Sequence, residues 1–168
     1  QALDSGITCF DTADTYGSGL GETILAKALG DKRSHIIIGT KVGYDFYHHT
    51  SRRGQEELPQ DWRPEYVRFA LEESLKRLNI TCVDLYQPHN PRLDAIQRDD
   101  LFATLEQLKA EGKIRAYGVA LGPAIAERQI DEGKAAIESR HVDIVQIIYN
   151  LLEQMLGQSL FAVGRQHR

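Results

Sequence analysis

Short runs of apolar, mostly β-branched residues alternate with longer amphipathic runs along the whole chain. The short runs, which predict strands, cover residues 7–11, 36–41, 83–87, 114–121 and 142–149. The amphipathic runs, which predict helices, cover residues 21–29, 64–78, 99–111 and 125–139, with a helix or a frayed end over 151–168. This alternation is typical of βαβ units and predicts a parallel sheet in an α/β domain.

The number of predicted strands suggests part of a barrel. Residues 1–6 resemble the tail of a helix stopped by a glycine, and residues 164–168 stand where another strand would be expected. Five strands in 168 residues make about two-thirds of an eight-stranded (β/α)8 TIM-type barrel, which typically takes ~250 residues. We therefore expect one domain, residues 1–168, forming a partial barrel of about five parallel strands with crossover helices. Units would be missing at both ends, and a doubly wound open sheet is the alternative.

Composition excludes several classes of protein. A hydrophobic content of 42% suits a folded core, and a net charge of −4 argues against a nucleic-acid partner. No apolar run approaches the ~20 residues of a membrane helix, so no membrane partner is expected. Cys9 and Cys82 make no disulfide framework, and the first residues lack a signal-peptide layout. A soluble, cytoplasmic protein is the simplest reading. His48 and His49 are adjacent on the chain, and no metal site is expected.

Ionisable residues follow the predicted strands where parallel sheets gather their chemistry. Asp11 and Lys41 end the first two strands, Tyr16 lies in the loop after the first, and His89 follows the third. A free tyrosine has a pKa of ~10, and a neighbouring ammonium lowers it. Asp11 would supply the counter-charge that a buried Lys41 needs, and a neutral His89 would orient a carbonyl. Such a site protonates an oxygen while a hydride, which requires a nicotinamide cofactor, attacks the carbon.

At this point the sequence resembles the aldo-keto reductases. The similar blocks are FDTADTYG at 10–17, GTK at 39–41, DLYQPH at 84–89, GKIRAYGV at 112–119 and VQIIYNLL at 145–152. They follow one another in the family's order over nearly the whole chain, from roughly the second strand to the sixth helix of the barrel. Each block alone is weak, and the combination is specific.

The resemblance implies a (β/α)8 barrel that binds NADP(H), with NAD(H) also open. It implies a small-molecule aldehyde or ketone as substrate, or the matching alcohol. It assigns the general acid to Tyr16, the lowering of its pKa to Lys41, the holding of Lys41 to Asp11 and the positioning of the carbonyl to His89. On the cofactor side it assigns Gln146 to the nicotinamide carboxamide and Tyr149 to the wall around the ring, with Asp11 close by.

Other residues near the strand ends complete the expected site. The long loop over residues 42–62 lies at the barrel mouth and should shape substrate choice. Trp62, Tyr44 and Asn90 are the expected substrate-pocket residues, and the composition of the loop suits a polar or sugar-like carbonyl compound. Many members of the family carry Ser-Asn where this chain has Ala120 and Leu121. The side-chain contacts to the nicotinamide carboxamide that those two residues make are therefore not expected here, unless backbone groups compensate.

Two other functions remain open from the sequence. A non-catalytic nicotinamide-binding barrel could regulate a partner, or the fragment could be inactive. In an unrelated doubly wound binding module, the positions of Lys41 and His89 would be coincidental. A Lys41 ammonium more than ~6 Å from the Tyr16 oxygen would favour such a module.

Asp14 is a loop residue outside the catalytic set, and the glycines at 17–21 form a turn rather than a phosphate loop. The sequence does not specify the substrate or the oligomeric state.

Overall fold

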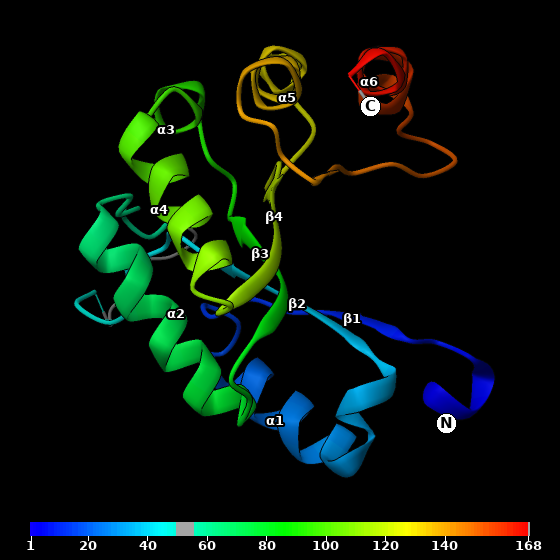
Figure 1. Ribbon diagram of the computed structural model, residues 1–168. Coiled ribbons are helices and arrows are strands. Elements are labelled where there is room, and N and C mark those ends of the chain that lie inside the picture. The colour runs from blue at the N-terminus through cyan, green and yellow to red at the C-terminus, as the bar shows by residue number, and fades with distance from the viewer. Residues whose placement is uncertain (50–55, 168) are drawn as a thin grey trace.

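A computed structural model describes residues 1–49 and 56–167 and shows five parallel strands in one curved sheet (Figure 1). Their order in the sheet is their order in the chain, as in a (β/α)8 barrel. The strands are β1 (Cys9–Asp11), β2 (Ile37–Val42), β3 (Val83–Pro88), β4 (Ile114–Ala120) and β5 (Ile144–Gln146). The predicted fold class, a partial barrel, is confirmed.

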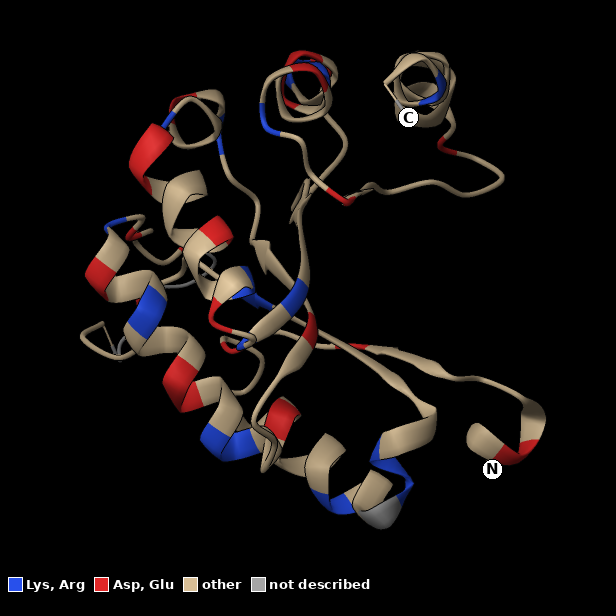
Figure 2. Cartoon of the chain, in the orientation of Figure 1, with Lys and Arg blue, Asp and Glu red and all other residues tan. Residues whose placement is uncertain are grey.

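Helices connect successive strands and lie on the outside of the sheet (Figure 1). The main helices are α1 (Leu20–Leu29), α2 (Pro64–Leu78), α4 (Asp99–Ala110), α5 (Arg128–Ser139) and α6 (Met155–Gln166). Shorter pieces are η1 (Leu3–Ser5), η2 (Gly30–His35) and α3 (Leu93–Ile96). Charged residues concentrate on the helices and are sparse on the strands (Figure 2). None of the helices within the two described ranges is long and apolar enough to span a bilayer.

The helix over 64–78 has the predicted bounds, because Pro64 fixes its start and Asn79, with a φ of 54°, ends it. The run at 142–149 forms only a three-residue strand. It is apolar enough for a longer strand, but the ladder with β4 pairs only Ile144, Val145 and Gln146. The α5 helix starts at Arg128 rather than at residue 125, because the Gln129 side chain accepts the Ala126 N–H. The four-residue α3 is too short to show a helical period in the sequence.

The core lies between the sheet and its helices. Val67 and Leu71 of α2 and Leu105 of α4 are fully buried against β2, β3 and β4. Burying each such side chain contributes roughly 1.5–3 kcal/mol. This packing fixes the strands in register, and the register decides which side chains share one level of the sheet.

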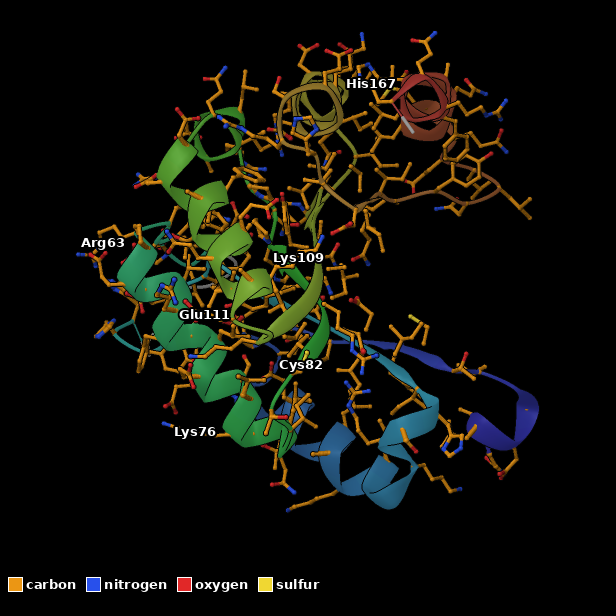
Figure 3. The ribbon with its side chains drawn as sticks, in the orientation of Figure 1. Arg63, Lys76, Cys82, Lys109, Glu111 and His167 are labelled. Carbon is orange, nitrogen blue, oxygen red and sulfur yellow. The ribbon has the colours of Figure 1, made fainter. Side chains whose placement is uncertain are left out.

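The register brings the carboxyl ends of the strands to one edge. Asp11 pairs with Gly39, Lys41 with Gln87, and Ala120 with Gln146. Cys82, labelled in Figure 3, comes immediately before β3 and marks the opposite end of the sheet. The expected site residues therefore leave the sheet on the same side.

Candidate active site

A buried Lys41 and a partly exposed Asp11 form an ion pair across β1 and β2. The Lys41 side chain is 3% exposed, and its Nζ lies 2.5 Å from Asp11 Oδ2. The same nitrogen donates a second hydrogen bond to the Thr12 carbonyl oxygen over 2.7 Å. Two of the three ammonium protons are thus used, and the charge of Lys41 is compensated where water cannot reach it.

Tyr16 lies in a tight turn after β1. Its backbone N–H donates to Ala13 O, and its carbonyl accepts from the Gly21 N–H. Gly19, at a φ of 92°, packs against the Arg77 side chain so closely that a Cβ there would lie 2.6 Å from Arg77 Cδ. The turn presents the half-exposed Tyr16 ring with its centre 5.5 Å from Lys41 Nζ.

The acidity of Tyr16 differs from the sequence-based expectation. Burial of the ring and the negative charge of Asp11 raise the pKa of Tyr16 above its ordinary value. Lys41 does not reverse this, because Asp11 sits 2.5 Å from its ammonium and offsets its charge. The phenol therefore holds its proton firmly at neutral pH.

His89 faces both tyrosines from the loop after β3. Its ring centre lies 5.7 Å from that of Tyr16 and 5.1 Å from that of Tyr44, each in an edge-on arrangement. Burial, with the positive charge of Lys41, lowers the pKa of His89 to about 4. Its Nδ1 is buried without a hydrogen-bond partner among the described residues. The imidazole is therefore neutral at physiological pH and can donate a hydrogen bond to a carbonyl oxygen.

These groups open into one cavity of about 600 Å³. Its polar wall includes Tyr16, Lys41, His89 and Gln146, and its apolar wall is formed by Ala120, Leu121, Ile147 and Ile148. The cavity also holds two side chains that the sequence predicted for the substrate pocket. Asn90 Nδ2 donates to the Tyr44 hydroxyl over 2.9 Å, and that hydroxyl donates to Glu57.

Two expected pocket residues lie elsewhere. Trp62 does not line the cavity; its ring packs against Gly43, whose φ of 136° and lack of a side chain make room for it. Tyr149 also lies outside the lining, because its ring packs edge-on against Phe161 of α6 at 5.2 Å. In both cases, contact with a neighbouring loop or helix directs the ring away from the cavity.

Backbone groups near Ala120 are already engaged. The Ala120 carbonyl accepts from the Asn90 N–H, and the Leu121 N–H donates to Gln146 O. The backbone compensation considered for these two positions is therefore not available from these groups. Side chains such as Gln146 are therefore the remaining candidates that we consider for holding a polar ligand at this wall.

Sequence reasoning missed a buried polar cluster behind the site. Glu22 is fully buried and accepts from Arg77 Nε at 2.6 Å and from Thr40 Oγ1 at 2.5 Å. Asp14 is also fully buried, and neither carboxylate oxygen has a partner within the described ranges. Burial, reinforced by Glu22, raises the pKa of Asp14 well above its usual value. No pattern in the sequence marks these two carboxylates as buried, because acidic residues in loops and on helices are usually exposed.

Asp45 approaches both members of the histidine pair. Its carboxylate lies 2.9 Å from His48 Nδ1 and 3.7 Å from His49 Nε2, a neighbour that the sequence argument overlooked. Within residues 1–49 and 56–167, no group of three or more side chains is arranged to hold a metal ion.

Comparison with known proteins assigns the family. The Aldo/keto reductase family model matches residues 1–167. The chain belongs to the aldo-keto reductase family. An aldo-keto reductase of Bacillus halodurans in its holo form is 32% identical, with a TM-score of 0.81 over 99% of this chain and 51% of that one.

Two further aldo-keto reductase relatives have solved structures. Glycerol dehydrogenase of Gluconobacter oxydans is 31% identical, with a TM-score of 0.78 over 99% of this chain and 48% of that one. An aldo-keto reductase of Klebsiella pneumoniae, in complex with NADPH, is 25% identical, with a TM-score of 0.75 over 99% of this chain and 51% of that one. The chain spans 44% to 47% of curated relatives that it matches along nearly its whole length.

Proposed function

We propose that the protein transfers a hydride between NADP(H) and the carbonyl carbon of a small aldehyde or ketone, with Tyr16 as proton donor. The observation that carries this proposal is that Tyr16, the ammonium of Lys41 and a neutral His89 line one cavity, with Lys41 paired to Asp11 behind it. Family membership supports the same reaction class. NAD(H) is the alternative cofactor.

The residues present fit the nicotinamide end of the cofactor. A nicotinamide is a flat ring that carries one amide, and the cavity pairs an apolar wall with the amide of Gln146. His89 Nδ1, buried and without a partner in the described ranges, marks a polar position that a ligand can satisfy. The bound cofactor would supply or accept the hydride, and NADPH in the Klebsiella relative supports this choice.

Each of these side chains then has its own role in the reduction of the carbonyl group. His89, neutral above pH ~5, donates a hydrogen bond that orients the carbonyl. Tyr16 gives its proton to the oxygen as the hydride reaches the carbon, so the carbonyl becomes an alcohol. Asp11 keeps Lys41 in place and offsets part of its charge. The remaining positive charge, 5.5 Å from the centre of the Tyr16 ring, would attract the phenolate that Tyr16 leaves. Because Tyr16 holds its proton firmly, it is in the proton-donating form near neutral pH.

The lining of the cavity favours a polar substrate. Tyr44, Asn90 and Glu57 place hydroxyl, amide and carboxylate groups beside His89. Such groups suit the hydroxyls of a small polyol-type carbonyl, and the glycerol dehydrogenase relative supports that class.

The test is carbonyl-dependent oxidation of NADPH by the full-length protein, which is monitored as the loss of absorbance at 340 nm. We expect turnover with glyceraldehyde, slower turnover with an apolar aldehyde such as benzaldehyde, and weaker use of NADH. Tight NADPH binding without turnover on any aldehyde or ketone would instead favour a regulatory barrel. Absence of nucleotide binding would contradict the proposal altogether.

A further inference from the structure

A line of side-chain hydrogen bonds crosses the carboxyl ends of four strands, and two of its members, Lys41 and Gln146, line the cavity. Lys41 donates to Asp11 Oδ2, and Gln146 Nε2 donates to the same oxygen over 3.3 Å. Gln87 Nε2 in turn donates to Gln146 Oε1 over 3.0 Å. The line joins β2, β1, β5 and β3, and its last member, Gln87, has no role in the chemistry proposed above.

The direction of every bond in this line follows from Asp11. A carboxylate paired with Lys41 can only accept hydrogen bonds, so Gln146 must turn its NH2 group towards Asp11. Gln146 then presents its oxygen to β3, and only a donor can pair with it there. Gln87 is that donor. The orientation of both amides is therefore fixed by the ion pair and needs no separate assignment.

Gln87 supports Gln146 without reaching the cavity. It is fully buried and is not among the residues that line the cavity, whereas Gln146 is. Its own Oε1 is buried without a partner in the described part of the chain. Burying an amide with an unsatisfied oxygen is unfavourable, so an apolar residue would suit this strand position better if packing were its only task.

We propose that Gln87 is a positioning residue that holds the Gln146 amide with one N–H free towards the cavity. The inference rests on the proposed function, because the acceptor for that N–H is the carboxamide oxygen of the nicotinamide. The Leu121 N–H cannot take over this task, because it already donates to the Gln146 carbonyl oxygen. Without Gln87, the Gln146 oxygen loses its donor and the amide is free to rotate away from its position.

The experiment measures nucleotide affinity in the full-length Gln87→Met protein by fluorescence titration. Methionine has nearly the volume of glutamine and lacks the donor. We expect the Kd for NADP+ to rise roughly threefold to tenfold, the effect of one neutral hydrogen bond. The Kd for 2′,5′-ADP, which lacks the nicotinamide, should be unchanged.

Two further variants separate positioning from a general loss of structure. Gln129→Met removes an equally buried amide, in α5, and should leave both affinities unchanged. In the background of Gln146→Met, Gln87→Met should cause no additional loss, because Gln87 acts through Gln146. If Gln87→Met does not fold, Gln87→Asn, which keeps the amide but shortens its reach, should show the same selective loss.

The outcomes distinguish this inference from the proposed function. If the unmodified protein binds no NADP(H), the proposed function fails. If the unmodified protein binds NADP+ and the Gln87 variants bind it equally well, the inference alone is overturned. Additive losses in the double variant, or equal losses for NADP+ and 2′,5′-ADP, would also overturn it.

Discussion

Replacement of His89 by glutamine should make the protein less sensitive to acid. The pKa of His89 lies at about 4 in the folded chain, against 6.5 for the free group, because burial and Lys41 oppose its charge. Between these values the unfolded state binds a proton that the folded state does not, so stability rises with pH and is lost as pH falls from 6.5 to 4. A displacement of 2.5 units, taken from those two values, corresponds to about 3 kcal/mol of unfolding free energy.

The assay is urea unfolding at pH 7.5, 5.5 and 4.5 for wild type and His89→Gln. The variant should lose about 2–3 kcal/mol less than wild type between the highest and lowest pH. His35→Gln, a replacement of an exposed histidine, is the matched control and should keep the wild-type pH dependence. If the unfolding free energies of wild type and His89→Gln changed equally with pH, the reasoning would be refuted, because the pKa of His89 would then not be lowered by burial.

Three other predictions follow from packing. Arg77→Met should destabilise the protein by about 3 kcal/mol in urea unfolding, because it leaves the charge of the fully buried Glu22 without its cationic partner. Adding Glu22→Gln should recover most of the loss, and no recovery would contradict the ion-pair account. Gly43→Ala should cost roughly 2 kcal/mol, because its Cβ would lie 2.2 Å from the Trp62 ring, whereas Gly30→Ala, also at positive φ but with open space around it, should cost less. A polypeptide of residues 1–168 alone should self-associate in size-exclusion chromatography, because Leu151 and Leu152, between β5 and α6, are 92% and 94% exposed and β5 ends the sheet; a single sharp monomer peak would contradict this.

The sequence could predict features that depend on local periodicity and strand order. The α2 helix follows from Pro64 and the apolar spacing after it, and β2 follows from its isoleucines. The meeting of Asp11 and Lys41 follows from a general property of parallel sheets, whose strand ends share one edge. These features need no knowledge of how distant side chains pack.

Features that depend on packing between distant segments could not be predicted. Trp62 and Tyr149 are aromatic residues at suitable points of the chain, but Gly43 and Phe161 decide where their rings lie. The raised pKa of Tyr16 depends first on the burial of its ring and then on the nearby charge of Asp11, and both follow from the packed structure.

Gln87 lies between these two cases. A glutamine between a tyrosine and a proline near the end of a strand can be seen in the sequence. Its partner, however, lies 59 positions further along the chain, and the direction of its hydrogen bond depends on Asp11. Only the register of the sheet brings these three side chains together.

The most direct test of the central claim is the rate of carbonyl reduction by Tyr16→Phe in the full-length protein, measured beside its affinity for NADPH. No hydrogen bond from the Tyr16 hydroxyl joins it to another described residue, so stability should change by less than about 0.5 kcal/mol. The account predicts a fall in kcat of roughly 100-fold or more, with NADPH binding within about twofold of wild type. A variant that keeps more than about a tenth of wild-type kcat would show that the proton comes from another group.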